Sequence, residues 1–510
     1  MPTALVVGAG FGGIAAALRL RARGYQVTVI DRASLLGGRA QVFRRGDFVF
    51  DAGPTVITAP FLIDELFALF GRDSRDYVEL KPLDTWYRIR FPDGQQFNYG
   101  GSVDDTLAEI ARFNPADCDG YLRLVETSRR IFEVGFSQLA HQPFHRFSEM
   151  LKQLPRLLAL RSYRTVYGLV AAHIKHPALR QAFSLQPLLV GGNPFDTTSI
   201  YVLIHYLERK WGVHFAMGGT GALVAGLGRL MTEVGIDIRL NETVSEILIE
   251  QGDARGVRLE NGQQLSADLV VVNGDPPYVY KHLIPAQHRR QWSDKRIERL
   301  RYSMGLFVLY FGTTRQYPDV AHHTIWLGQT YKKLLKNIFH RQVLSDDFSL
   351  YLHRPTATDP SMAPAGCDSF YVLSPVPNLQ SGIDWETEGP RYQQRIVEAL
   401  HNTILPGLKE HLVHDFTMTP VDFKNNYLSH WGTGFSIAPL FSQSAYFRFH
   451  NRADDIGRLY FVGAGTHPGA GVPGVLSSAK VLDSLIPPAH QWQNLSHAHN
   501  DRNHRVTAAG

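Results

Sequence analysis

The chain opens with two short apolar segments separated by a pattern compatible with a helix. Residues Ala4–Val7 are small and apolar, Ile14–Arg23 can form a helix that ends at Gly24, and Gln26–Ile30 is rich in β-branched residues. This order predicts a strand, a helix and a second strand within the first 31 residues.

Similar apolar segments recur in two distant parts of the chain. The range 219–275 predicts a helix that ends near Val234, then strands, the last being a buried parallel strand over Ala267–Val272. Near the C-terminus, Arg458–Val462 predicts a strand and Val475–Ile486 a helix. The loop between them, Gly463–Gly474, is longer and richer in glycine than an ordinary strand–helix connection.

Glycines follow the first predicted strand in the pattern G-x-G-x-x-G, at Gly8, Gly10 and Gly13. The first permits a tight turn, the second lets a pyrophosphate approach the backbone, and the third lets the helix and strand pack closely. Asp31 ends the second strand, where it can accept hydrogen bonds from an adenosine ribose. The bare glycine pattern also arises by chance, but its strand, helix and acid together indicate a dinucleotide site.

A second glycine pair, in Leu36–Ala40, comes soon after Asp31 and carries Arg39. Free backbone amides and a guanidinium suit a second contact with a pyrophosphate, although a surface turn explains this pair equally well. The chain then runs into Phe48–Thr55, which we interpret as a loop returning to a tightly held cofactor. This position favours FAD over NAD.

These segments predict a discontinuous FAD-binding domain of α/β (α+β), Rossmann type, with an inserted lobe that binds the substrate. We assign the ranges as follows: FAD-binding domain, 1–75, 219–275 and 456–486; substrate-binding and membrane-contacting lobe, 76–218 and 276–455; disordered tail, 487–510.

Composition narrows the class of protein. Hydrophobic residues make up 44% of the 510 and charged residues 19%, as in a folded globular protein. A net charge of +5 is compatible with an anionic membrane surface and too small to indicate nucleic acid. Two cysteines, Cys118 and Cys367, exclude a disulfide framework or a cysteine-based metal site.

The expected location of the protein rests on two kinds of segment that the sequence does not show. No export signal or membrane-spanning run is visible, so we expect a cytoplasmic protein that meets a membrane, if at all, from the side. We expect no metal site, and only adventitious metal binding at the histidines after Pro487, which are His490, His497, His499 and His504.

The range 150–195 contains no acid but carries several bases among apolar residues at helical spacing. The bases are Lys152, Arg156, Arg161, Arg164, Lys175 and Arg180, and the apolar residues are Leu154, Leu157, Leu158, Leu160, Tyr163, Val166, Tyr167, Leu169 and Val170. This pattern favours contact with a bilayer surface, and a packed helix pair with a cationic outer face is the alternative. Tyr331–Arg341 is a weaker candidate of the same kind.

Five motifs carry a resemblance to a known family. They are Val6–Gly13, Gly37–Ala40, Phe50–Val56, Leu189–Phe195 and the highly specific Val462–Gly471. With them the chain, from about residue 3 to about residue 486, resembles the bacterial-type phytoene desaturases. The one departure is Asp31, where many relatives carry Glu, a change that keeps the hydrogen-bond acceptor.

The resemblance implies an FAD enzyme of the amine-oxidase and GDI-like superfamily that converts 15-cis-phytoene, by successive two-electron desaturations, to neurosporene or lycopene. It also implies oxygen or a quinone as electron acceptor, with the protein on the inner face of the cell membrane. The alternatives are another carotenoid-modifying or amine-oxidising flavoprotein, and a non-enzymatic prenyl-binding protein of the GDI type.

We therefore predict two groups of site residues. The FAD site is Gly8, Gly10, Phe11, Gly12, Gly13, Asp31, Gly38, Arg39, Pro54, Thr55, Val244, Gly465, Pro473, Gly474 and Val475. Glu149 is the candidate catalytic acid or base, because it is the last acid before the acid-free range and relatives carry an acid there; a solvated surface carboxylate is the alternative.

An apolar substrate must be recognised by burial. An ordinary core is the alternative, and for any single residue it is the better interpretation, so only the set as a whole is expected to line a tunnel. The set is Phe183, Leu185, Leu188, Leu189, Val190, Phe195, Tyr201, Leu203, Ile204, Tyr206, Leu207, Phe307, Val308, Leu309, Tyr310 and Phe311.

Overall fold

The computed structural model describes residues 1–492, apart from the side chain of Leu154. Its first sheet is parallel and has the strand order β19-β13-β1-β2-β9. The strands are β1 (Thr3–Val7), β2 (Gln26–Ile30), β9 (Asp237–Arg239), β13 (Leu269–Val272) and β19 (Leu459–Phe461). They come from the ranges 1–75, 219–275 and 456–486, so one sheet joins three distant parts of the chain.

Apolar helices cover this sheet, which explains why its strands read as continuous apolar runs. All four residues of β13 are buried. The covering helices include α1 (Phe11–Ala22), α9 (Thr220–Glu233) and α16 (Val472–Leu485), and α1 packs against both of the others. Both α1 and α16 begin three residues earlier than the sequence pattern predicts, at Phe11 and Val472.

A second sheet of seven strands lies wholly in the ranges 76–218 and 276–455, with the order β18-β14-β17-β16-β15-β6-β7. All its pairs are antiparallel except β15 with β6. The strands are β6 (Thr85–Arg90), β7 (Gln96–Gly100), β14 (Gly305–Thr313), β15 (His323–Trp326), β16 (Leu350–His353), β17 (Asp368–Val376) and β18 (Leu412–Met418).

Three smaller β-structures complete the strands. Their members are β3 (Val42–Arg45) with β4 (Phe48–Asp51), β5 (Leu80–Pro82) with β8 (His214–Ala216), and β10 (Val244–Glu250) with β11 (Asp253–Leu259) and β12 (Gln264–Ser266). The prediction of a loop over Phe48–Thr55 is therefore wrong for its first half, because Phe48–Asp51 pairs with β3 as a hairpin.

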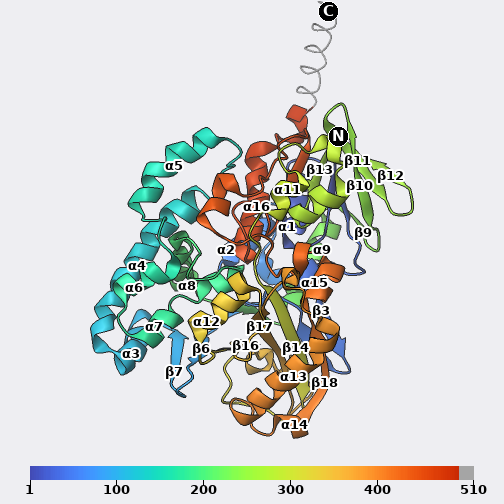
Figure 1. Cartoon of the computed structure of the whole chain (residues 1–510). Helices are drawn as coiled ribbons and strands as arrows, with labels where there is room; N and C mark the ends of the chain where they lie inside the picture. The colour runs from blue at the N-terminus through green and yellow to red at the C-terminus, as the bar shows by residue number, and fades with distance from the viewer. Residues whose placement is uncertain (493–510) are drawn as a thin grey trace, which may run out of the picture.

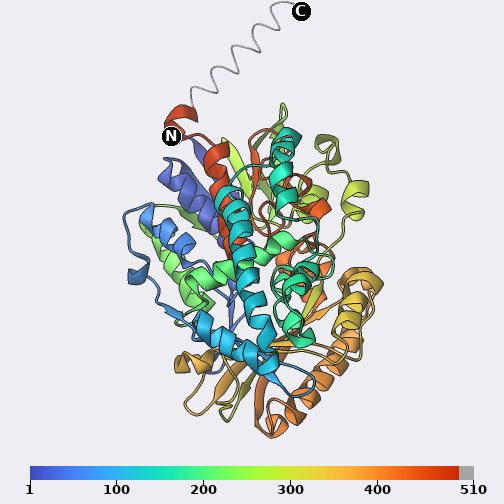
Figure 2. The same ribbon diagram turned by 90° about the vertical axis from the view of Figure 1, so that its left-hand side faces the viewer.

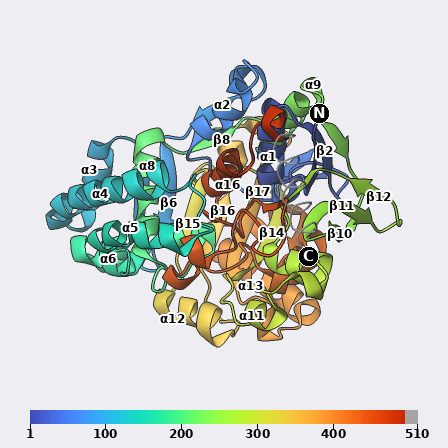
Figure 3. The same ribbon diagram turned by 90° about the horizontal axis from the view of Figure 1, so that it is seen from above.

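Helices from the inserted lobe gather along one side of the molecule, opposite the hairpins β10–β12 (Figures 1 and 3). These helices are α3 (Val103–Phe113), α4 (Cys118–Phe132), α5 (Phe147–Ala159), α6 (Val166–His173), α7 (Pro177–Ala182) and α8 (Leu203–Trp211). Figure 2 looks onto this side, with α4 running along it.

The remaining helices lie around the two large sheets. They are α2 (Pro60–Ala68), α10 (Pro276–Tyr278), α11 (Asp294–Glu298), α12 (Tyr331–Lys336), α13 (Trp385–Asn402), α14 (Leu408–His411) and α15 (Pro420–Tyr427). Within residues 1–492, none of the helices combines the length and the apolarity that crossing a membrane requires.

The residues that directly follow α16 pack against the rest of the fold. The Tyr25 hydroxyl donates to the Pro487 carbonyl at 2.8 Å, and the Ala489 amide donates to the Arg23 carbonyl at 2.9 Å. Ala489 and Trp492 are buried. The prediction of disorder is therefore wrong for residues 487–492, while His497, His499 and His504 lie outside the described residues.

Candidate active site

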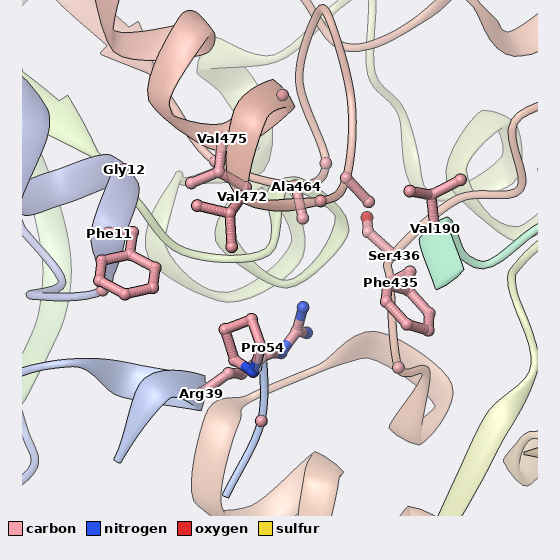
Figure 4. A pocket seen from close by; sticks show the side chains of 18 of the residues that line it. Phe11, Gly12, Arg39, Pro54, Val190, Phe435, Ser436, Ala464, Val472 and Val475 are labelled. Carbon is pink, nitrogen blue, oxygen red and sulfur yellow. The ribbon is translucent and has the colours of Figure 1, made fainter. Parts of the chain in front are cut away.

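A cavity of about 620 Å³ lies at the carboxyl ends of the parallel strands. The loops after β1, β13 and β19 all contribute to its wall, as is usual for ligand sites in open parallel sheets. Figure 4 shows Arg39 and Pro54 on one side of the cavity and Val472 on the other. The fold thus brings residues separated by more than 400 positions to one site.

The first glycine loop leaves its backbone open to this cavity. Gly8, Gly10, Phe11 and Gly12 line it. Gly10 caps α1 without a side-chain hydrogen bond, and the first turn of α1 carries no acid, so the amides at this helix end are available to an anion. Gly13 is different: it does not line the cavity, and a Cβ there would lie 1.9 Å from the Gly8 carbonyl oxygen.

Two acids line the cavity beside this loop. Asp31 accepts hydrogen bonds from the amides of Ala9, at 2.6 Å, and Ala33, at 2.8 Å. Glu242 was missed by the sequence analysis; its Oε2 is buried and has no hydrogen-bond partner in residues 1–492. An unpaired buried acceptor fits a ligand that brings hydroxyl or amine donors, as the nucleoside half of FAD does.

A partly exposed positive group, Arg39, lies across the cavity from the C-terminal loop. Arg39 donates to the Ser429 hydroxyl at 2.5 Å, and burial lowers the pKa of its guanidinium. Asp275, which follows β13, also lines the cavity and accepts from the His430 amide at 2.7 Å; burial raises its pKa. Gly38, Pro54, Thr55 and Val244 line the cavity as well.

The C-terminal loop supplies the opposite wall, with Gly465, Pro473, Gly474 and Val475 among its lining residues. Gly471 caps α16 without a side-chain hydrogen bond, and no acid lies in the first turn. The positive end of this helix dipole therefore meets the cavity as well. With uncapped amides at two helix ends, a guanidinium and an unpaired acceptor, the residues fit FAD.

The apolar part of the cavity is lined by about half of the predicted tunnel residues. These are Leu185, Leu188, Leu189, Val190, Tyr201, Leu203, Ile204, Leu207 and Val308. The others do not line the cavity, and of these Phe183, Phe307, Leu309, Tyr310 and Phe311 are buried in packed core, the alternative for each single residue. In β14 the reason is the strand period: Leu306 and Val308 face the cavity, whereas Phe307, Leu309 and Phe311 face the opposite side of the sheet.

Glu208 is a titratable residue of this apolar region that the sequence analysis missed. It lies in α8, lines the cavity, and is fully buried. The Tyr87 hydroxyl donates to its Oε1 at 2.9 Å. Burial raises the pKa of Glu208 to about 7, although Tyr87, Arg209 and Gln186 act to lower it. In the sequence, Glu208 is distinguished only by its position directly after Leu207, one of the predicted tunnel residues.

The structure places Glu149 outside this cavity. Its side chain is 39% exposed on α5 and forms an ion pair with Lys152 at 2.9 Å. It lines a separate surface hollow with Gln138, Gln153 and Arg156. Because Glu208 lines the cavity and Glu149 does not, Glu208 is the better candidate for contact with a ligand in the cavity.

Comparison with known proteins identifies the family. Residues 11–481 match the model of the flavin containing amine oxidoreductases. The chain is 47% identical to a lycopene-forming phytoene desaturase of Pseudescherichia vulneris, over 95% of this chain and 99% of that protein. It is 43% identical to a neurosporene-forming phytoene desaturase of Rhodobacter capsulatus, over 96% and 94%.

A solved structure supports the fold. An oxidoreductase from Methanosarcina mazei is 15% identical and aligns with a TM-score of 0.61, over 95% of this chain and 99% of that chain. The expected flavoprotein fold is confirmed, as are the family and FAD as the cofactor. The chain belongs to the flavin-containing amine oxidoreductases and, among them, to the phytoene desaturases, and it is an FAD-dependent oxidoreductase.

Proposed function

We propose that the protein dehydrogenates 15-cis-phytoene in successive two-electron steps to neurosporene and/or lycopene, with oxygen or a quinone receiving the electrons. The observation that carries this proposal is that the uncapped ends of α1 and α16 and an apolar region lined by leucines belong to the same cavity. The names of the relatives, which form lycopene or neurosporene from phytoene, support the substrate. An amine substrate would leave the long apolar region unexplained.

The direct test is product analysis. FAD-loaded protein is incubated with 15-cis-phytoene in liposomes, in air or anaerobically with a quinone, and the pigments are separated by chromatography. We expect carotenes with longer conjugation than phytoene. Protein that holds FAD but leaves phytoene unchanged with both acceptors would contradict the proposal.

For the FAD site, we propose that the chain holds the cofactor through the residues that line the cavity. The amides around Gly8, Gly10 and Gly12 and the guanidinium of Arg39 would bind phosphate oxygens, and Asp31 the ribose. The backbone from Gly465 to Val475 would face the ring system. When bound to these residues, FAD would supply a hydride acceptor for the desaturation.

Each desaturation also releases a proton, which needs an acceptor. We propose Glu208 for this role in place of Glu149, because Glu208 is the buried carboxyl in the wall of the apolar region. A pKa of about 7 leaves it ionised in a useful fraction of molecules and makes it a stronger base than an ordinary carboxylate. The apolar walls exclude water from the proton acceptor.

We also propose that α5 docks on the inner surface of the cell membrane. Three exposed large apolar side chains lie on α5, at Phe147, Leu151 and Leu158, and exposed Tyr163 follows the helix. The exposed bases Lys152, Arg156 and Arg161 belong to the same segment. Met150 and Leu157 on the same helix are buried and line the cavity. A hydrocarbon dissolved in the bilayer would thus reach the cavity beneath α5. By contrast, Tyr331, Leu334, Leu335 and Ile338 are buried in core, so they offer no apolar surface to a membrane.

The α5 contact predicts the behaviour of a triple variant, Phe147→Ser, Leu151→Ser and Leu158→Ser. Each half-exposed side chain contributes roughly 1 kcal/mol to insertion, so vesicle binding should fall about 100-fold. The measurement is flotation with vesicles of phosphatidylcholine and phosphatidylglycerol. The matched control replaces Leu35, Leu122 and Val343, which are similarly exposed elsewhere, and should float like the unmodified protein. Equal flotation of both triple variants would contradict the contact.

A further inference from the structure

Three histidines meet inside the seven-stranded sheet, away from the glycine loops. His323 is the first residue of β15 and His322 directly precedes it, and His353 ends the neighbouring strand β16, where it pairs in register with His323. All three are buried. One ring nitrogen of each lies within 4.8 Å of those of the other two.

The outer hydrogen bonds of two of these rings leave their inner nitrogens free. Nδ1 of His322 lies 2.7 Å from the Thr358 hydroxyl, and Nδ1 of His323 lies 2.8 Å from the Tyr351 hydroxyl. The Nε2 atoms of both rings are buried and have no hydrogen-bond partner among the described residues. When Nδ1 carries the proton and donates, Nε2 presents a lone pair, which is the form that binds a metal.

The third ring and a carboxylate complete the cluster. Neither nitrogen of His353 makes a hydrogen bond within residues 1–492, and its Nε2 lies 3.4 Å from Oδ2 of Asp51. Asp51 is fully buried at the end of β4, and its Oδ1 accepts from the Thr220 amide at 2.8 Å. Its Oδ2 likewise has no hydrogen-bond partner in the described chain. So many unpaired polar atoms in one buried place indicate a missing ligand.

We propose that His322, His323 and His353 bind a divalent transition-metal ion, for which zinc is the best match, with the Asp51 carboxylate beside His353. Imidazole nitrogens are borderline donors of the kind that zinc prefers. Zinc–nitrogen bonds of about 2.0–2.1 Å place tetrahedral ligands about 3.4 Å apart, so the nitrogens approach by at most about 1.4 Å on binding. The proposal departs from our expectation that the chain has no metal site.

None of the three histidines lines the cavity, so we assign the site a structural role. It ties β15 to β16. It also orients the cavity wall: the Tyr351 hydroxyl that contacts His323 lies 3.1 Å from the Thr55 hydroxyl, and both Tyr351 and Thr55 line the cavity.

The test uses FAD-loaded protein, stripped with a chelator and then titrated with Zn²⁺ or Co²⁺. Elemental analysis by mass spectrometry should find about one zinc ion per chain. Tetrahedral Co²⁺ should add absorption bands at longer wavelength than those of the flavin, and zinc should abolish them. A chain that takes up no metal, or cobalt without these bands, would overturn the proposal.

Variants separate this site from adventitious binding. His353→Gln and His322→Gln should each abolish the cobalt bands, and Tyr351→Phe, which removes an outer hydrogen bond, should weaken the metal affinity about 10- to 100-fold. The control replaces His497, His499 and His504 by Ala and should bind metal normally. Metal lost in the control but kept in the other variants would show an adventitious ion only. Flavin content and absorption report folding, and Tyr351→Phe keeps the test decisive should a ligand variant not fold.

Discussion

Replacing Glu208 by glutamine is expected to lower the turnover number with phytoene by about 10²–10⁴-fold, the usual contribution of a positioned general base. Glutamine keeps the size of the side chain and can accept the hydrogen bond from Tyr87, so folding and FAD content should be unchanged. The measurement is the rate of product formation per bound FAD at saturating phytoene.

Glu149→Gln is the matched control for this change. Glu149 is partly exposed and paired with Lys152, so its variant should retain the rate of the unmodified protein. If Glu208→Gln retained full turnover, or Glu149→Gln lost it, the assignment of the proton acceptor would be wrong.

The pH dependence provides a second readout of the same group. A base must be ionised to act, and the pKa of Glu208 is about 7, so turnover should rise with pH between about pH 6 and 8. The residual activity of Glu208→Gln should lack this rise. Because the folded-state pKa is raised from 4.5 to about 7, the unfolded chain releases this proton first, and stability falls as the pH rises from about 4.5 to about 7. The glutamine variant should therefore lose less stability than the unmodified protein over that range, as thermal unfolding would show.

Gly13→Ala is expected to weaken FAD binding about 10- to 100-fold, because relief of a packing overlap costs about 1–3 kcal/mol. The new Cβ would lie 1.9 Å from the Gly8 carbonyl oxygen and 3.0 Å from its carbon. These are backbone atoms, so the turn must move, and with it the amides of Gly8–Gly12 that line the cavity. Flavin fluorescence titration of the apoprotein measures the change.

The control for this variant is Gly389→Ala. Gly389 lies inside α13, and its Cβ would meet no atom closer than the Thr419 methyl carbon at 3.8 Å. It should bind FAD normally. Circular dichroism shows whether Gly13→Ala folds, and a folded Gly13→Ala chain with unchanged FAD affinity would contradict the proposed role of the turn.

The nucleotide loops could be predicted from the sequence because their determinants are local. A strand of small apolar residues, glycines at fixed spacing and an acid at the end of the next strand lie within 31 residues, and the structure places β1, α1 and β2 there. The buried strands β13 and β19 were likewise recognisable from short apolar runs. The starts of two helices were misplaced, since the cap residues of α1 and α16 are Gly10 and Gly471, which have no side chain to signal a helix start.

The apolar lining was only half predictable. Composition identifies an apolar segment, but which side chains of β14 face the cavity depends on which face of the sheet the other elements cover. Phe307 and Val308 are neighbours in sequence and face opposite sides.

The tertiary structure alone determines which titratable side chains are buried and which groups surround them. Glu149 and Glu208 are both helical acids in the sequence; packing buries one of them in the cavity wall and leaves the other at the surface. In the histidine cluster, the pairing of β15 with β16 places His323 opposite His353, and tertiary packing brings Asp51 of β4 beside His353. The reactivity of a carboxylate or an imidazole depends on its desolvation and its neighbours, and both are set by contacts between residues far apart in the chain.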